Sequence, residues 1–213
     1  MAAAGQVIAC TAPTAAMQRI SDAAGAGLTW FVECDLPRAK VAGFETKMIA
    51  RYPQLARDRF LNHRVRKAGG SVYRLIVLDT PTEAVARCWL MTNLPDGHER
   101  WSDATAVRPK LWMYETVRQT KEGAGRPVWT WRIEKTAYRG LREVLIERIR
   151  KKQDQELLAF CEGSKKWAGF AGVRVQHKAL GSLLWDEWRR SRGQAETMPE
   201  WPRLRYVQRL KTR

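Results

Sequence analysis

The stretch SVYRLIVLDTPTEAVARCWLMTN, residues 71–93, decides the fold. It contains two apolar runs, SVYRLIVLD and ARCWLMTN, that are rich in residues favoured in strands. The segment TPTEA between them has the Thr and Pro chemistry of a turn. Two such runs joined by a short turn predict neighbouring antiparallel strands. The surrounding chain is therefore expected to be organised about an antiparallel sheet.

A second hairpin and an earlier strand extend this prediction. LWMYETVRQT and VWTWRIE flank KEGAGRP, residues 121–127, where two glycines and a proline supply the turn. In the later run Trp129, Trp131 and Ile133 lie on one side, and this side is expected to face the core. LTWFVECDLP, residues 28–37, is expected to form another strand that ends at its proline.

Helical periodicity surrounds the strands. After Arg38 apolar residues recur at helical spacing and Pro53 interrupts them, which predicts two helices or one kinked helix. The spacing is helical again over 136–161 and 173–192, and Gly193 is placed to end the last helix. This order predicts an α+β fold with a mostly antiparallel sheet of about five strands covered by helices. C-terminal helices and an extended basic tail are expected to follow.

The composition changes along the chain and suggests three parts. Residues 1–27 are rich in Ala, Gly and Thr and offer few bulky side chains, so a flexible arm is expected there. Residues 28–165 hold all of the expected strands and predict a single α+β core domain. Residues 166–213 contain the last helix and the basic tail, which are expected to pack on the core or extend from it.

The chain is strongly basic, with a formal net charge of +16 and a pI near 10.2. Such an excess repels itself unless an anionic partner compensates it, and nucleic acid is the commonest such partner. Arg supplies most of the basic side chains, and its planar guanidinium binds phosphate in a bidentate manner. Arg also has GC-rich codons, so a high-GC genome is an alternative source of the Arg content but not of the total charge.

The positive charge is concentrated in three segments. Residues 51–67 and 135–152 each carry a net charge of +5, and residues 199–213 carry +4. Uniform codon bias does not produce such segregation, which a binding surface requires. The alternative for each segment is a solvated face that keeps the protein in solution. The side chains expected to contact phosphates are Arg57, Arg59, Arg64, Arg66, Lys67, Arg139, Arg142, Arg150, Lys151, Arg203, Arg205, Arg209 and Lys211.

Three aromatic side chains lie close to basic residues in the sequence. Trp167, Trp201 and Tyr206 are candidates for stacking on unpaired bases. The alternative is that each anchors its own segment to the core.

No sequence pattern names a reaction. The four cysteines form no C-x-x-C pair and the three histidines show no ligand spacing, so neither a metal site nor a cofactor is expected. Nucleophile elbows and phosphate-binding glycine loops are absent from the sequence. Acids near strand ends are the candidates for a metal-dependent nuclease if they converge, although such acids are also common in turns and caps. These acids are Glu33, Asp35, Asp79 and Glu134.

The leading hypothesis is a non-enzymatic basic accessory protein, from a high-GC bacterium or its mobile DNA, that binds nucleic acid through phosphates. DNA is favoured over RNA as the partner. The second hypothesis is an adaptor or inhibitor that docks on an acidic protein of a DNA-processing or DNA-transfer machine. A metal-dependent nuclease is the third. The sequence has no run of about 18 apolar residues, so no membrane span is expected, and reduced thiols suit a cytoplasmic location.

Overall fold

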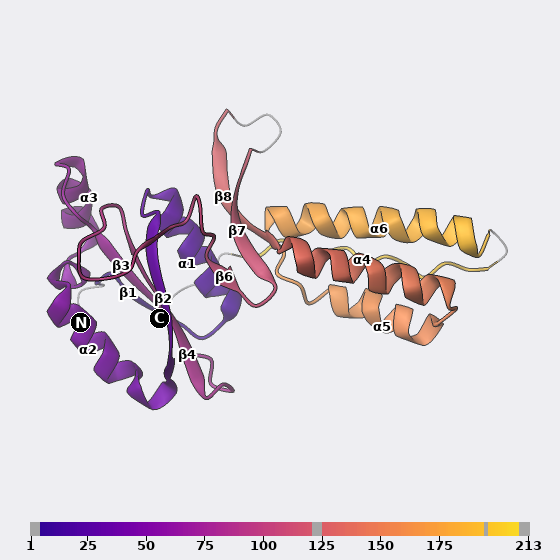
Figure 1. The fold of residues 1–213 in the computed structure, drawn as a ribbon, viewed down its shortest axis with the longest axis horizontal. Helices are drawn as coiled ribbons and strands as arrows, with labels where there is room; N and C mark the ends of the chain where they lie inside the picture. The colour runs from indigo at the N-terminus through magenta and orange to yellow at the C-terminus, as the bar shows by residue number, and fades with distance from the viewer. Residues whose placement is uncertain (1–4, 121–124, 194–195, 209–213) are drawn as a thin grey trace. The chain divides into compact units, whose positions relative to one another are not determined.

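A computed structural model of the 213-residue chain describes residues 5–120, 125–193 and 196–208. These residues combine helices with two sheets, so the expected α+β class is confirmed (Figure 1). The described residues divide into two compact units. The first contains residues 5–111, Thr120 and 125–129, and the second contains residues 112–119 and 130–208. The division after Leu111 differs from the expected single core over 28–165.

The first unit is built on a five-stranded sheet in the order β1-β3-β4-β2-β5. β3 and β4 are the antiparallel pair predicted from residues 71–93, and Val77 lies opposite Cys88 in their register. β4 also pairs antiparallel with β2, whereas β1 runs parallel to β3 at one edge. The sheet is therefore mostly antiparallel, as expected. Its strands are β1 (Val7–Cys10), β2 (Trp30–Pro37), β3 (Tyr73–Leu78), β4 (Val85–Thr92) and β5 (Ser102–Asp103).

Helices cover both faces of this sheet. α1 (Pro13–Gly25) packs on β3 and β4. The short 3-10 helix η1 (Arg38–Lys40) leads into α2 (Val41–Arg51), which precedes a second 3-10 helix, η2 (Pro53–Ala56). Because alternate strand side chains point to opposite faces, α2 and η2 pack on the other side of the sheet from α1. That side has a core of Leu36, Met48, Tyr52, Leu55, Tyr73, Leu75, Val77, Ala86, Cys88 and Leu90.

The structure differs from the expected flexible arm over residues 1–27. Within this segment β1 belongs to the sheet and α1 buries Met17 and Ile20, which are 1% and 0% exposed. The composition misleads because alanine favours helices and its small side chain lets α1 approach the sheet closely. Residues 7–25 are therefore part of the core, and residues 1–4 lie outside the described residues.

A three-stranded sheet with the order β6-β7-β8 contains the second predicted hairpin. Its strands are β6 (Lys110–Leu111), β7 (Tyr114–Thr120) and β8 (Pro127–Ile133). Trp131 and Ile133 of β8 are fully buried, as expected for the core side of this strand. Trp129 on the same side is only half-buried, and Thr130 on the opposite side is also buried. The middle of the predicted turn, residues 121–124, lies outside the described residues.

Three helices form the body of the second unit (Figure 1). They are α4 (Lys135–Arg150), α5 (Asp154–Ser164) and α6 (Ala171–Ser191). The helical pattern predicted over 136–161 is split, because Lys152 adopts a left-handed backbone conformation with φ 56° between α4 and α5. The three helices share a core of Leu145, Ile149, Leu157, Cys161, Leu180, Leu184 and Trp188. No helix in the described residues is both long and apolar enough to cross a membrane.

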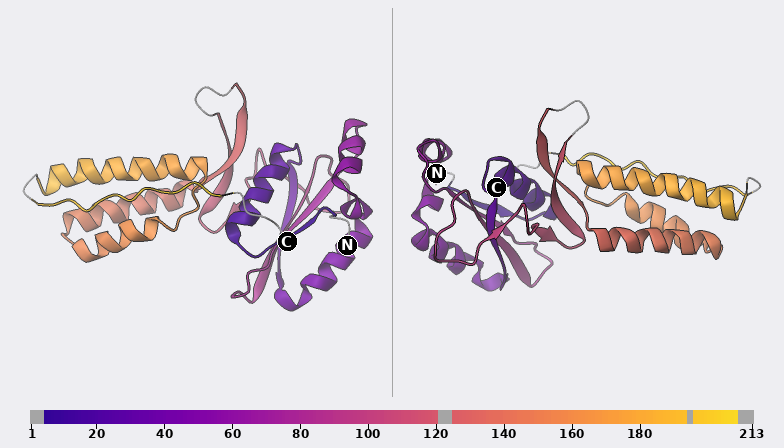
Figure 2. Two further views of the ribbon diagram at one scale, coloured as in Figure 1. Left: turned by 180° about the vertical axis from the view of Figure 1, so that it is seen from behind. Right: turned by 45° about the horizontal axis from the view of Figure 1, so that its top comes forward.

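Beyond α6 the chain has no regular secondary structure over residues 196–208, as expected for an extended tail. Figure 2 shows this segment running back along the helices of the second unit. Trp201 holds it in place, because its indole lies over Gly181 of α6 and its ring centroid is 4.7 Å from that of His177.

Alanine at position 181 is expected to loosen this packing. A Cβ atom there would lie 2.5 Å from Cδ1 of Trp201, well inside the ~3.5 Å at which carbon atoms make favourable contact. We expect Gly181→Ala to cost about 1–3 kcal/mol, although alanine is otherwise worth about 1 kcal/mol over glycine within a helix. Thermal unfolding measures the change. In a Trp201→Ala background the same substitution should instead stabilise, and equal losses in both backgrounds would contradict the assigned contact.

Candidate nucleic-acid interface

The basic segment over residues 51–67 folds into a short capped helix, α3 (Arg59–Lys67). Asp58 is its N-cap, and the carboxylate of Asp58 accepts a hydrogen bond from the backbone N–H of Leu61 at 2.7 Å. Arg64, Arg66 and Lys67 occupy the last turn, where positive charge complements the helix dipole. The sequence thus uses its single acid at the start of α3 and leaves the rest of the helix cationic.

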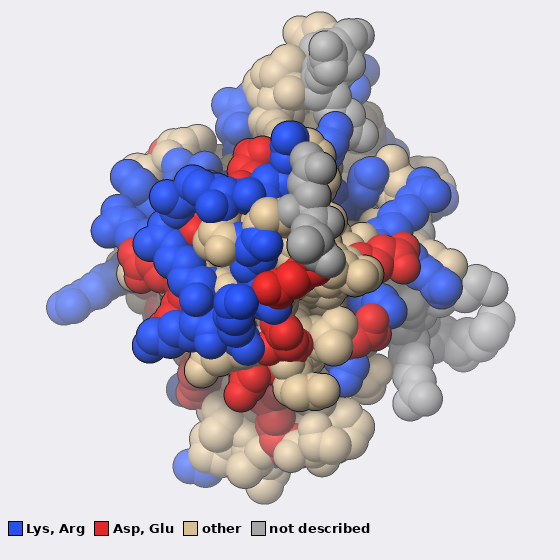
Figure 3. All heavy atoms as spheres, turned by 90° about the vertical axis from the view of Figure 1, so that its right-hand side faces the viewer, with Lys and Arg blue, Asp and Glu red and all other residues tan. Residues whose placement is uncertain are grey.

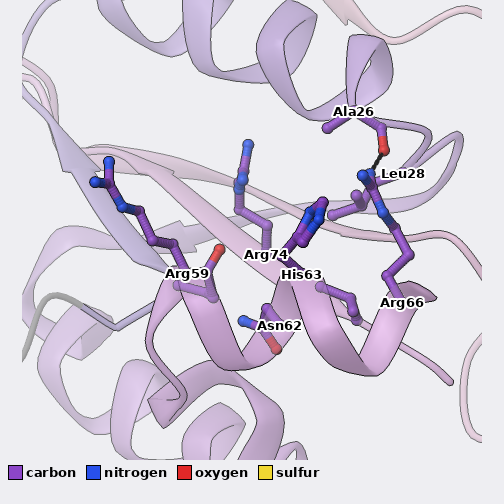
Figure 4. Close-up of a pocket in the computed structure, with 9 residues that line it drawn as sticks. Ala26, Leu28, Arg59, Asn62, His63, Arg66 and Arg74 are labelled. Atoms are coloured by element: carbon purple, nitrogen blue, oxygen red, sulfur yellow. Dashed lines mark hydrogen bonds between the residues drawn. The ribbon is translucent and has the colours of Figure 1, made fainter. Parts of the chain in front are cut away.

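One face of α3 carries four polar side chains. Arg59, Asn62, His63 and Arg66 recur at the spacing i, i+3, i+4 and i+7, which places them along one side of a helix with 3.6 residues per turn. Figure 4 shows Arg59, His63 and Arg66 extending from α3 toward the same side as Arg74 of β3. The guanidinium of Arg66 donates a hydrogen bond to the carbonyl of Ala26, just after α1.

These side chains line a pocket of about 150 Å³, named here the α3 pocket. Arg59, Asn62, His63 and Arg66 come from α3, and Arg74 comes from β3. The remaining lining residues, Gln6, Ala26, Leu28 and Val72, carry no charge. The α3 pocket is therefore lined by three guanidinium groups and an imidazole, and no acidic side chain of the described residues lies in its wall.

Buried polar atoms in the α3 pocket lack hydrogen-bond partners. Asn62 is only 4% exposed, yet neither Oδ1 nor Nδ2 of its amide has a partner. Nε of Arg74 is likewise buried without one. Burial lowers the pKa of Arg74; Asp22 opposes this shift, and the nearby Arg19 and Arg66 reinforce it. Because buried polar groups are normally hydrogen-bonded, these atoms mark a place for a polar ligand.

The structure brings together the expected phosphate contacts of the first segment. Arg57 immediately precedes the N-cap of α3, and Arg59, Arg64, Arg66 and Lys67 all lie on the helix. Among the ion pairs of the described residues, none involves any of these five side chains. Their positive charge is therefore not neutralised by acids of the described part of the protein.

An exposed aromatic side chain, not among the aromatic residues predicted to stack on bases, also lies on α3. Phe60 is 65% exposed, and the guanidinium carbon of Arg59 lies 4.7 Å from its ring centroid. A large apolar ring exposed among cations is available for stacking on an unpaired base. Its place directly after Arg59, within the basic segment, was the available signal.

The predicted contacts on α4 have a different environment. Arg150 donates to Glu187 of α6 at 2.6 Å, and Lys151 donates to Glu147 at 2.6 Å. Burial by itself raises the pKa of Glu187, but hydrogen bonds from Arg150 and Arg190 hold that pKa below its usual range. Figure 3 faces this end of the second unit and shows acidic side chains among the Lys and Arg. Arg139 and Arg142 are exposed on the earlier part of α4.

The tail residues and their aromatic neighbours fall into two groups. Arg203 and Arg205 are exposed, whereas Arg209 and Lys211 lie outside the described residues. Trp167 and Trp201 contact Phe160 and His177, so both anchor their segments, as the alternative interpretation held. Tyr206 is exposed, and the guanidinium carbon of Arg174 lies 3.3 Å from its ring centroid.

Three of the four candidate nuclease acids interact with other side chains of the first unit. Glu33 accepts a hydrogen bond from Nε1 of Trp89 at 3.1 Å, and burial raises its pKa. Asp35 pairs with Arg87 at 3.3 Å, and Asp79 pairs with Arg38 at 2.7 Å. Glu134 belongs to the second unit, where it precedes α4. Within the described residues no group of three His, Cys, Asp or Glu side chains is placed to hold a metal ion.

Comparison with protein-family models, with curated proteins and with solved structures finds no significant match to the chain.

Proposed function

We propose that the protein binds nucleic acid and that the cations of α3 supply the main contacts to the phosphate backbone. The observation that carries this proposal is the lack of acidic partners for Arg57, Arg59, Arg64, Arg66 and Lys67 within the described residues. These side chains occupy one short helix and the residue before its cap, so their fields add. Arg is also the side chain best suited to phosphate, because its fork of N–H donors matches two phosphate oxygens.

The contrast with α4 supports the choice of α3. A cation that already donates to a carboxylate must give up that interaction, or share it, before it can bind phosphate. Arg150 and Lys151 are in this position, since each has a carboxylate oxygen at 2.6 Å. The cations of α3 bear no such cost. When they bind phosphates, the release of counterions therefore contributes fully to the affinity and to its salt dependence.

The test compares two triple variants that remove the same charge from different helices. Arg57→Ala, Arg64→Ala and Lys67→Ala change cations of the α3 segment outside the α3 pocket. Arg150→Ala, Lys151→Ala and Lys152→Ala change three cations at the end of α4, each of which pairs with a carboxylate. We expect the α3 variant to bind labelled oligonucleotides about 100-fold more weakly at low salt. We also expect it to lose roughly 2–3 units of the slope of log K against log salt, because each phosphate contact contributes about 0.7–0.9.

Fluorescence anisotropy over a salt series measures both quantities, with single-stranded and duplex oligonucleotides of the same sequence. The α4 variant should change the slope by less than one unit. Equal losses in the two variants would show that net charge, and not α3, determines binding. A wild-type protein without salt-dependent binding to either oligonucleotide would refute the proposal and leave an acidic protein as the partner to examine.

A further inference from the structure

We propose that the α3 pocket binds one phosphate group at the end of a molecule, as in a phosphate monoester. The α3 pocket is distinct from the outer cations Arg57, Arg64 and Lys67, which serve the backbone contacts proposed above. If the ligand is the terminal phosphate of a nucleic acid, the inference rests on the proposed function. If the ligand is a small phosphate monoester, the inference depends on the α3 pocket alone.

The fold concentrates positive charge around the α3 pocket. Arg59, His63 and Arg66 from α3 converge with Arg74 from β3 around a volume of about 150 Å³ (Figure 4). Asp22 of α1 acts electrostatically on Arg74, but it lines no part of the α3 pocket and already pairs with Arg19 at 3.1 Å. Cations held close together repel one another, so an anion bound among them stabilises the folded state.

The α3 pocket also contains buried donors without acceptors. A phosphate oxygen can accept from Nδ2 of Asn62 and from Nε of Arg74, two donors of the α3 pocket that have no hydrogen-bond partner in the described part of the chain. Arg66 is already oriented, because its guanidinium donates to the carbonyl of Ala26 and has further N–H groups to offer. The α3 pocket therefore presents hydrogen-bond donors from both α3 and β3, including the oriented guanidinium of Arg66. This arrangement suits an anion with several oxygens.

The size of the α3 pocket also suits a phosphate group. Its volume of about 150 Å³ accommodates a group of five heavy atoms, and the pocket is partly open to solvent, so the sugar attached to that phosphate stays outside. An internal phosphodiester carries a sugar on each side, whereas a terminal phosphate carries only one. The α3 pocket is thus matched to a terminal or free phosphate.

The experiment uses the full chain and two sets of probes. Inorganic phosphate and a nucleoside 5′-monophosphate, with the unphosphorylated nucleoside as control, are titrated while thermal unfolding is followed. We expect saturating phosphate or monophosphate to raise the Tm of the first unit by about 5 °C, and the nucleoside to leave it unchanged. Oligonucleotides with a 5′-phosphate, a 3′-phosphate or hydroxyls at both ends form the second set. One phosphorylated form should bind about tenfold more tightly than the hydroxyl form.

Asn62→Leu is the informative variant. It replaces a buried, unpaired amide with an apolar side chain of similar size, so folding should be retained or improved while the phosphate donor is lost. We expect it to abolish the preference for a terminal phosphate and to weaken binding of inorganic phosphate at least tenfold. Arg74→Gln should have the same effect. Arg64→Ala, outside the α3 pocket, should weaken all oligonucleotides equally and leave the phosphate titration unchanged.

The outcomes separate the two proposals. If oligonucleotides bind with salt dependence but neither free phosphate nor a terminal phosphate changes any measurement on the wild-type protein, the inference is wrong and the proposed function stands. If free phosphate and the monophosphate bind and Asn62→Leu removes that binding, while oligonucleotides do not bind, the α3 pocket is a site for small phosphate monoesters and the proposed function is wrong.

Discussion

Truncation of Ile20 to alanine is expected to destabilise the first unit by about 2–5 kcal/mol, the usual cost of emptying a fully buried aliphatic site. Ile20 is 0% exposed on α1, the helix that packs on β3 and β4. A loss of this size is a large share of the stability of a small domain, so the Tm of the first unit should fall by more than about 10 °C. Thermal and urea unfolding measure the change.

The control lies on the same helix. Gly25 is exposed at the end of α1, and a Cβ atom added there meets nothing within 4 Å, so Gly25→Ala should be neutral or slightly stabilising. A stability of Ile20→Ala equal to that of the wild type would mean that residues 7–25 are the mobile arm that their composition suggested. Phosphate binding at the α3 pocket should also weaken in Ile20→Ala, because α1 leads directly into Ala26, whose carbonyl orients Arg66.

The central hairpin could be predicted because the local sequence of each of its strands has the pattern of a strand. Residues 71–93 combine strand-forming runs with a turn, and the observed register of β3 and β4 needs no distant information. β1 could not be found in this way. It is a four-residue edge strand whose partner, β3, lies more than sixty residues later in the chain, and only the tertiary structure joins them.

The interface was predictable in part. The cations of α3 follow from the density of Arg between residues 57 and 67, but the α3 pocket depends on Arg74, which comes from a separate strand. Two signals in the sequence could have indicated it. The first is a spacing typical of one helical face, shown by Arg59, Asn62, His63 and Arg66. The second is Arg74, a charged residue within the apolar run YRLIVL, because charged side chains are rarely buried without a partner.

The charge on α4 shows the limit of counting residues. Glu147 and Lys151 are four residues apart, so their ion pair could be expected from helical spacing alone. Glu187, which accepts from Arg150, lies 37 residues further along the chain. Net charge over 135–152 therefore overstates the positive field of this segment, because part of its compensation comes from another helix.

Acidification is expected to destabilise the second unit through His177. This side chain is 4% exposed, and its Nδ1 accepts a hydrogen bond from Nε1 of Trp201 at 3.2 Å. Nε2 therefore carries the proton and donates to the hydroxyl of Ser164 at 3.1 Å, and this hydroxyl donates to the carbonyl of Cys161. The network requires a neutral imidazole, and burial lowers the pKa of His177 to about 4.

The direction of this pH dependence follows from the linkage between proton binding and folding. Between about pH 6.5 and 4 the unfolded chain binds a proton at His177 that the folded unit excludes, so stability is complete above 6.5 and falls as the pH is lowered. A shift of this size corresponds to ~3 kcal/mol, which should lower the Tm by about 10 °C or more by pH 4.5. The acids that form ion pairs with Arg150 and Arg192 have lowered pKa values. The stability that they contribute is lost as the pH falls through and below their unfolded pKa values of about 4, so most of this loss comes at lower pH than that of His177.

Tryptophan fluorescence during thermal unfolding at pH values from 7.5 to 4.5 measures this dependence. His177→Leu removes the titrating group, and it should be less stable than the wild type at pH 7.5 but nearly independent of pH down to 4.5. His98→Gln changes an exposed histidine of the first unit and should keep the wild-type profile. Because Trp201 donates to His177, protonation should also release residues 196–208, seen as faster proteolysis of the tail below pH 5.5. A wild-type Tm that stays constant over this range would contradict the buried neutral imidazole.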